Sequence, residues 1–204
     1  MGARQHLAQV LVIDDGSDDD TGAHAAAAGA EVVRHTQNAG KGAALVTGFR
    51  TLAQRGVDRV LTLDADGQHL PEEIPVLLAA SDAAPGSLVV GVRNKEGQEI
   101  RFINQVGNWV ADTLLRLIAG QSIPDTQSGF RVYPVQAILR LEARGTRYDF
   151  ETEILLRAAR AGVELRGVLT RVYYPPVAER ISHYAPLQDT LRIIGTVIDV
   201  LVRG

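Results

Sequence analysis

Short apolar runs alternate with segments of helical periodicity along the first half of the chain. The apolar runs are rich in β-branched residues, which is typical of buried strands, and they are bounded by Gly, Asp or Pro. Strands that alternate with helices indicate an α/β fold, with a mostly parallel sheet covered by helices on both faces. The expected strands lie at residues 10–13, 31–34, 60–63 and 87–92. The expected helices between them lie near residues 18–28, 40–52 and 71–80.

The second half has longer helical stripes and weaker strand signals. Apolar residues between 103 and 118 follow helical spacing, and no linker or repeat divides the chain. We therefore expect one domain over residues 1–204. The remaining expected elements are strands at 130–133 and 163–172, helices near 135–141, 150–161 and 187–202, and a basic, aromatic loop at 171–184.

Composition narrows the class of protein. The 204 residues are 46% hydrophobic and 22% charged, which is ordinary for a folded domain, and the net charge of -3 argues against a nucleic-acid partner. The chain has no cysteine, which excludes disulfides and thiolate metal sites. It has no apolar run of about 18 residues, and residues 1–9 lack the apolar core expected of a signal peptide. The expected location is the cytoplasm, with peripheral contact at the inner face of a membrane left open.

Two carboxylates directly follow the strand expected at 60–63. Asp64 and Asp66 are separated by one residue, so both can direct oxygens toward one hard cation such as Mg²⁺ or Mn²⁺. Such a cation would neutralise a diphosphate leaving group. The alternative is a pair of turn or capping residues. The position after a buried strand favours the metal site, because ligands of open α/β sheets bind at the carboxyl ends of the strands.

Two more polar segments fall at the same expected edge of the sheet. Asp14-Asp15-Gly16-Ser17 follows the first strand, where a carboxylate can bind a ribose or base; the alternative is an Asx turn. Asn38-Ala39-Gly40-Lys41-Gly42 places a lysine at a helix start, suited to a phosphate, and the alternative is a flexible turn with a solvated lysine. It is not a Walker A loop, because His35 stands where the first glycine is required.

Taken in order, these segments resemble a known family. The stretches DDGSDDDT, NAGKG, DADGQ, GVRN, DTQSGFRVY and YDFETEILLRA occur in the order seen in family-2 glycosyltransferases, in particular the dolichol- or polyprenyl-phosphate mannose synthase branch. The resemblance covers about residues 10–185. It implies a Rossmann-like GT-A fold and an inverting transfer of sugar from a GDP-mannose or UDP-glucose type donor. The implied acceptor is polyprenyl or dolichol phosphate, as used in cell envelope biosynthesis.

The resemblance also implies roles for individual residues. Catalytic roles are implied for Asp66 and Arg131, with the arginine meeting an acceptor phosphate. The implied donor-binding residues are Asp14, Asp15, Gly16, Ser17, Lys41, Asp64, Ala65, Asp66 and Arg93. The implied metal ligands are Asp64, Asp66 and Gln68. The implied acceptor-side residues are Ser128, Arg131, Arg180 and Ser182, within loops that also hold Asp125, Gly129 and Phe130.

Several side chains keep an alternative interpretation. Arg131 can instead be an exposed surface ion pair, and Glu153 either an acceptor-side residue or an ordinary solvated or N-terminal helix carboxylate. His35 and His69 show no metal-ligand spacing and are expected to be structural or surface residues, although His69 lies beside the expected metal site.

The sequence departs from the family in one respect. Members carry a strand ending in a Pro-x-x-Asn-Glu type motif ahead of the DDGS strand, whereas this sequence has nine residues there and no such motif. A central strand is therefore expected to be absent, which would leave neighbouring backbone groups unpaired. A nucleotide-sugar-binding module without turnover follows as an alternative function. A phosphorylation-dependent signalling receiver is a weaker alternative, because the Lys-Pro pair expected of that class is missing.

Overall fold

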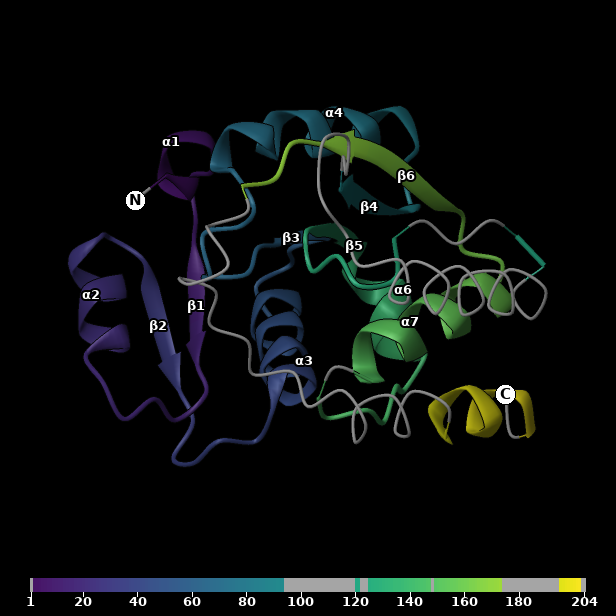
Figure 1. Cartoon of the computed structure of the whole chain (residues 1–204), viewed down its shortest axis with the longest axis horizontal. Coiled ribbons are helices and arrows are strands. Elements are labelled where there is room, and N and C mark those ends of the chain that lie inside the picture. Colours follow the sequence, from purple (N-terminus) through teal and green to yellow (C-terminus); the bar gives the residue numbers. More distant parts are fainter. Residues whose placement is uncertain (1, 94–119, 122–124, 148, 174–194, 203–204) are drawn as a thin grey trace.

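The computed structural model describes residues 2–93, 120–121, 125–147, 149–173 and 195–202 (Figure 1). The first half contains α1 (Ala3–His6), β1 (Leu11–Asp14), α2 (Thr21–Ala27), β2 (Glu31–Arg34), α3 (Lys41–Ala53), β3 (Arg59–Thr62), η1 (Pro71–Glu73), α4 (Ile74–Ala83) and β4 (Leu88–Arg93). The second half contains β5 (Arg131–Pro134), α6 (Val135–Arg140), α7 (Asp149–Arg160) and β6 (Leu165–Thr170). Residues 195–202 are helical.

The strands form two hydrogen-bonded groups. Strands β1 and β2 pair in parallel, and the other four follow the order β3-β5-β4-β6. Strand β5 runs antiparallel to both β3 and β4, whereas β4 and β6 are parallel. The prediction of a mostly parallel sheet is confirmed, with β5 as the strand that runs the other way. Among the described residues, no ladder joins the group of β1 and β2 to the other four strands. The absence of a central strand stays a prediction.

Helices cover both faces of the larger sheet, as predicted. Figure 1 shows α4 on one side of β4 and β6, with α6 and α7 on the opposite side and α3 next to them. Successive side chains along a strand point to opposite faces of the sheet, so each face packs into its own hydrophobic core. Val89 and Val132 pack with Ile74 and Leu77 under α4. Leu88 and Val90 face the second core. That core also includes Phe49 of α3, Tyr133 of β5, and Ile154, Leu155 and Leu156 of α7.

Helix α3 begins where a glycine turn allows it. Gly40 has a φ of +96°, a conformation that residues with a side chain rarely adopt, and Lys41 is the first helical residue. The backbone N–H of Gly42 donates to Thr146 O at 2.8 Å, which satisfies one of the free donors at the helix start. The loop before α7 therefore caps the start of α3.

Most expected elements are present within one or two residues. The strand at 31–34 has the expected bounds, and the helix at 71–80 is observed as η1 followed by α4. The short helix α1 was not predicted, because its few residues carry no apolar periodicity. The helix expected at 103–118 lies outside the described residues. No helix in the described part of the chain combines the length and apolarity that crossing a bilayer requires.

Candidate active site

Strands β3 and β5 bring their polar residues to one rim of the sheet. In the antiparallel register Thr62, the last residue of β3, pairs with Arg131, the first residue of β5. Asp64 follows β3, and Gly129 precedes β5. A Cβ atom at Gly129 would lie 2.9 Å from Asp64 Cγ, so glycine is what lets the carboxylate pack against this backbone. The start of β5 and the end of β3 thus contribute neighbouring residues to this rim.

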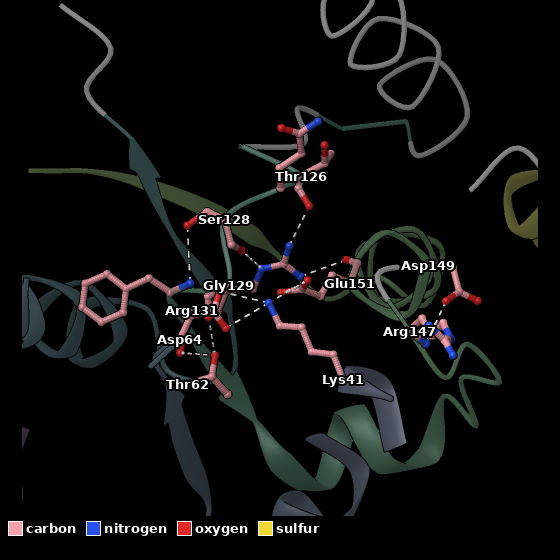
Figure 2. Close-up of polar contacts among 12 residues, drawn as sticks. Lys41, Thr62, Asp64, Thr126, Ser128, Gly129, Arg131, Arg147, Asp149 and Glu151 are labelled. Carbon is pink, nitrogen blue, oxygen red and sulfur yellow. Dashed lines mark hydrogen bonds and ion pairs between the residues drawn. The ribbon is translucent and has the colours of Figure 1, made fainter. Parts of the chain in front are cut away.

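Lys41 lies between two carboxylates at this rim. Its Nζ is 2.9 Å from Asp64 Oδ1, 3.0 Å from Asp64 Oδ2 and 3.0 Å from Glu151 Oε2. Figure 2 shows the lysine side chain extended from α3 toward Asp64 after β3 and Glu151 on α7. Burial lowers the pKa of Lys41, but the attraction of Glu151 and Asp64 outweighs it and raises that pKa above its ordinary value. The ammonium is therefore charged.

The alternative of a solvated Lys41 is wrong, because the side chain is only 24% exposed and forms two ion pairs. Glu151 was not predicted as a site residue. Its sequence context is that of an ordinary acidic residue at a helix start, and only the fold brings it to Lys41. Its side chain is 5% exposed, and among the described residues its Oε1 is buried without a hydrogen-bond partner.

Arg131 is fully buried and engages the chain's own carbonyl groups. Its guanidinium donates to Ser128 O at 2.7 Å, Thr126 O at 2.9 Å and Glu151 O at 2.8 Å (Figure 2). The alternative of an exposed surface ion pair is wrong, because the side chain is 0% exposed. In this structure the arginine fixes the loop at 126–129 to the start of α7. Contact with an acceptor phosphate stays a prediction.

Arg93 lies at the end of β4 and also meets the loop before β5. Its Nε donates to Asp125 Oδ2 at 2.6 Å and its Nη2 to Asp125 Oδ1 at 2.8 Å, which is a bidentate pair. The Ser128 side chain is buried on the same loop. The predicted donor residue Arg93 and the predicted acceptor residue Ser128 are thus joined through one loop.

The Asp15 carboxylate holds the turn that carries Lys41. It accepts hydrogen bonds from Ala39 N at 2.9 Å and Gly40 N at 2.7 Å, and its Oδ1 is 2.6 Å from His35 Nδ1. His35 Nε2 is 2.9 Å from Thr47 Oγ1 on α3. Burial raises the pKa of Asp15, but these hydrogen bonds together lower it by more, so the pKa lies below its usual value. His35 is structural, as expected.

Asp14 is buried at the end of β1. Its Oδ1 accepts a hydrogen bond from Ser17 N at 2.9 Å, and Arg34 Nη1 lies 3.5 Å from Oδ2. Hydrogen bonds from Ser17 are the main cause of its lowered pKa. Gly16 has a φ of +74°, and a Cβ atom at this position would lie 2.7 Å from the backbone carbonyl carbon of Gln37. The local turn of the alternative interpretation is present, and nucleoside binding by Asp14 to Ser17 stays a prediction.

Asp66 and Gln68 complete the predicted metal segment. Asp66 is exposed and its Oδ1 accepts a hydrogen bond from Gln68 N at 2.9 Å, while Ala65 is exposed beside it. His69 is buried against Phe130, and burial lowers its pKa against the pull of Asp64 and Asp66. The negative charges of Asp64 and Asp66 thus both act on the His69 imidazole. Their oxygens are the hard donors that Mg²⁺ or Mn²⁺ prefers, so the residue types fit such an ion.

The described residues offer few ligands for that ion. Within the described part of the chain, no group of three His, Cys, Asp or Glu side chains is arranged to hold a metal. A cation bound by Asp64 and Asp66 would need oxygens from substrate or water to complete its shell. Arg180 and Ser182, predicted on the acceptor side, lie outside the described residues.

Glu153 stabilises the loop that caps α3. Its Oε2 accepts hydrogen bonds from Arg144 N at 2.9 Å and Gly145 N at 2.6 Å, and its Oε1 pairs with Arg157 at 2.6 Å. A solvated carboxylate is excluded, because Glu153 is 2% exposed, whereas its place in the N-terminal half of α7 agrees with the alternative of an N-terminal helix carboxylate. Glu153 thus stabilises the loop whose Thr146 carbonyl accepts the hydrogen bond from Gly42 N at the start of α3.

Comparison with known proteins identifies the family. The sequence model described as "Glycosyl transferase family 2" matches residues 4–141. The chain belongs to glycosyltransferase family 2. This membership confirms the resemblance found in the ordered motifs, and the signalling receiver is excluded. The alternation of strands and helices read from the sequence is that of the GT-A fold.

Curated relatives share the polyprenyl-phosphate branch. The undecaprenyl-phosphate mannosyltransferase of Micrococcus luteus is 33% identical over 168 residues, which cover 75% of this chain and 67% of that protein. The polyprenol monophosphomannose synthase of Mycolicibacterium smegmatis is 34% identical over 165 residues, which cover 75% of this chain and 62% of that protein. The chain thus spans about two thirds of the length of these relatives.

A solved structure supports the same fold. The glucosyl-3-phosphoglycerate synthase of Mycobacterium tuberculosis, in complex with Mn²⁺, uridine diphosphate and glucosyl-3-phosphoglycerate, superposes with a TM-score of 0.67 at 27% identity. The match covers 95% of this chain and 67% of that protein.

Proposed function

We propose that this glycosyltransferase moves a sugar from a nucleoside diphosphate sugar to a lipid phosphate of the polyprenyl or dolichol type. The observation that carries the proposal is the cluster of Asp64, Lys41 and Glu151 at the rim where β3 ends and β5 begins. In a family-2 glycosyltransferase this rim is where a donor would bind, because ligands of open α/β sheets lie beyond the carboxyl ends of the strands.

The donor side is proposed to hold Mg²⁺ or Mn²⁺ through Asp64 and Asp66, with Gln68 beside them. A divalent cation there would supply positive charge to the departing diphosphate. The Mn²⁺ in the structure of the related M. tuberculosis enzyme supports this choice of ion. Lys41 lies next to Asp64, and its ammonium is proposed to meet the oxygens of the same diphosphate.

The acceptor is proposed to attack the anomeric carbon in line, with inversion. A phosphate monoester has a second pKa of about 6, so it is already anionic near neutral pH and requires no strong general base. Arg131 is proposed to act by holding the loop at 126–129 in place, because its donors are engaged by carbonyl oxygens. Arg180 and Ser182 are proposed to meet the phosphates on the acceptor side.

The segment at 195–202 supports contact with a membrane surface. Val197 and Val200 pack on the core, whereas Ile198, Leu201 and Val202 are 55%, 46% and 77% exposed. An amphipathic helix with an apolar outer face can lie in the interface of a bilayer. We propose that this face approaches the cytoplasmic side of the membrane that carries the lipid phosphate.

The alternative function is a module that binds a nucleotide sugar without turnover. The division of the sheet between β1 and β3 favours it, because Asp14 and Asp15, which are predicted to bind the nucleoside, lie at the end of β1 in the smaller group of strands. Calorimetry with nucleotide sugars, followed by a product assay, separates the two functions. Binding without transfer or hydrolysis would favour the module.

The test of the proposed function is a screen of donors and acceptors. Radiolabelled GDP-mannose and UDP-glucose are each incubated with undecaprenyl phosphate in detergent or with 3-phosphoglycerate, in the presence of Mn²⁺ or Mg²⁺. The proposal predicts labelled lipid from one donor and much less labelled phosphoglycerate. Label only in the soluble product would replace the lipid acceptor with a small phosphorylated one.

A further inference from the structure

The ammonium of Lys41 takes the place at Asp64 that a metal ion would need. It lies 2.9 Å and 3.0 Å from the two oxygens of this carboxylate, so both oxygens already face a cation. A metal ion binds carboxylate oxygens at about 2.0–2.2 Å, on the same side of the group. Two cations held that closely repel each other strongly in a partly buried site.

Glu151 offers the lysine a second position. Its Oε2 already binds Lys41 at 3.0 Å, and its Oε1 is buried without a hydrogen-bond partner among the described residues. An ammonium that leaves Asp64 can therefore stay paired with Glu151. The backbone that carries the lysine is fixed meanwhile by Asp15 and by Thr146, so the movement is confined to the side chain.

We propose that Lys41 is a built-in competitor for the divalent cation at Asp64, and that the donor diphosphate relieves the competition by drawing the ammonium toward its own oxygens. Metal and nucleotide then bind cooperatively, and the metal binds weakly without nucleotide. Phosphate oxygens are strong acceptors for a lysine ammonium. This inference rests on the proposed function, because it assumes a donor with a diphosphate and a metal at Asp64 and Asp66.

The test measures binding of Mn²⁺ from the electron paramagnetic resonance signal of the free ion, with and without UDP or GDP. Wild-type protein should bind Mn²⁺ about tenfold or more tightly when the matching nucleotide is present, a size typical of coupled sites. Lys41→Met should bind Mn²⁺ alone about as tightly as wild type does with nucleotide, because the competing charge is gone.

Two variants serve as controls. Lys41→Arg keeps the positive charge and should retain weak binding of Mn²⁺ alone. Arg55→Met removes an exposed cation that pairs with Glu31 far from the site and should match the wild type. Circular dichroism and thermal unfolding establish that each variant is folded. A folded Lys41→Met with unchanged or weaker affinity for Mn²⁺ would overturn the inference and leave the proposed function standing.

A second measurement uses the wild-type protein alone. The sequence has two lysines, Lys41 and Lys95, so labelling with [ε-¹³C]lysine gives two signals that Lys95→Arg assigns. Addition of Mg²⁺ and nucleotide should shift the Lys41 signal. A Lys41 signal unmoved by saturating Mg²⁺ contradicts the competition. If no variant binds Mn²⁺ even with nucleotide, the metal part of the proposed function fails as well.

Discussion

The Asp15 carboxylate receives two backbone N–H groups and an imidazole at hydrogen-bonding distance. These contacts connect the end of β1 to the turn before α3. The Asp15 carboxylate therefore fixes the position at which α3 begins, with Lys41 as its first residue. Arg131 acts in a similar way at the other side of the site, where its guanidinium holds carbonyl oxygens of the neighbouring loop. At the scale of single residues, these two charged side chains therefore position the backbone around the site.

Asp15→Asn tests the positioning role. The amide keeps the size of the side chain but loses the charge and one acceptor oxygen, so we expect a loss of about 1–3 kcal/mol in the free energy of unfolding. The Michaelis constant for the donor should rise, because the turn before Lys41 is less fixed. Urea unfolding and donor kinetics measure the two effects. Asp18→Asn changes an exposed carboxylate in the loop between β1 and α2 and should alter neither quantity.

The same variant has a pH signature. The pKa of Asp15 is lowered in the folded protein from an ordinary value of 3.8, so its contribution to stability is present above that value and is lost as the pH falls through the folded pKa. The difference in unfolding free energy between wild type and Asp15→Asn should therefore be full at neutral pH and shrink in acid. A difference that stays constant or grows in acid would contradict the hydrogen-bonded carboxylate.

Gly129→Ala tests the packing of Asp64. The added Cβ would lie 2.9 Å from Asp64 Cγ, so the carboxylate or the strand must move. We expect a fall in transfer rate of about tenfold or more, since small displacements of site residues are costly. Gly195→Ala is the matched control, because its Cβ would meet no atom within 4 Å. Equal rates for the two variants would show that the position of Asp64 is unimportant.

At the scale of elements, local patterns predicted most of the described fold. The β-branched run at 31–34 and the glycine turn before Lys41 gave β2 and α3 close to their observed bounds, because each signal is contained in a few neighbouring residues. The direction of β5 was not predictable in this way. Its short run Arg131–Pro134 has no periodicity that distinguishes a parallel from an antiparallel partner, and the pairing with β3 is set by tertiary contacts.

The segment at 195–202 provides a test at this scale. Ile198→Ser with Leu201→Ser removes apolar area from the outer face while Val197 and Val200 keep their core contacts. We expect weaker sedimentation with vesicles and slower transfer to a lipid phosphate in vesicles, with unchanged thermal stability. Val76→Ser, on the exposed side of α4, is the control. Unchanged vesicle binding by the double variant would exclude this face from membrane contact.

At the scale of the whole molecule, the two groups of strands differ in their support. Strand β4 has hydrogen-bonded neighbours on both sides, whereas the ladder between β1 and β2 is the one described for either strand. We expect the amides of β1 and β2 to exchange with solvent faster than those of β4, because fewer contacts must open. Hydrogen exchange followed by mass spectrometry measures this. Equal protection of β1 and β4 would indicate one cooperative sheet.

The site itself was predictable in its acids and less so in its partners. Asp64 and Asp66 follow a strand directly, so local sequence identified them. The contact of Lys41 with Glu151 depends on α3 and α7 meeting at the rim, which no local pattern encodes. Arg131 was expected to meet an acceptor phosphate, with an exposed ion pair as the alternative, and only the fold shows that its side chain is buried. Local sequence thus identifies the acidic residues of the site, whereas the residues that position them are recognised only from long-range contacts.

A divalent cation at Asp64 and Asp66 is proposed to assist the transfer of sugar from a nucleotide sugar. The most direct measurement is the initial rate of labelled lipid formation, with EDTA and then with added Mn²⁺, for wild type and Asp64→Asn. EDTA is expected to stop the wild-type reaction and Mn²⁺ to restore it, and Asp64→Asn is expected to be slower by about 100-fold or more at every metal concentration. Undiminished transfer in EDTA, or by Asp64→Asn, would contradict this role of the cation.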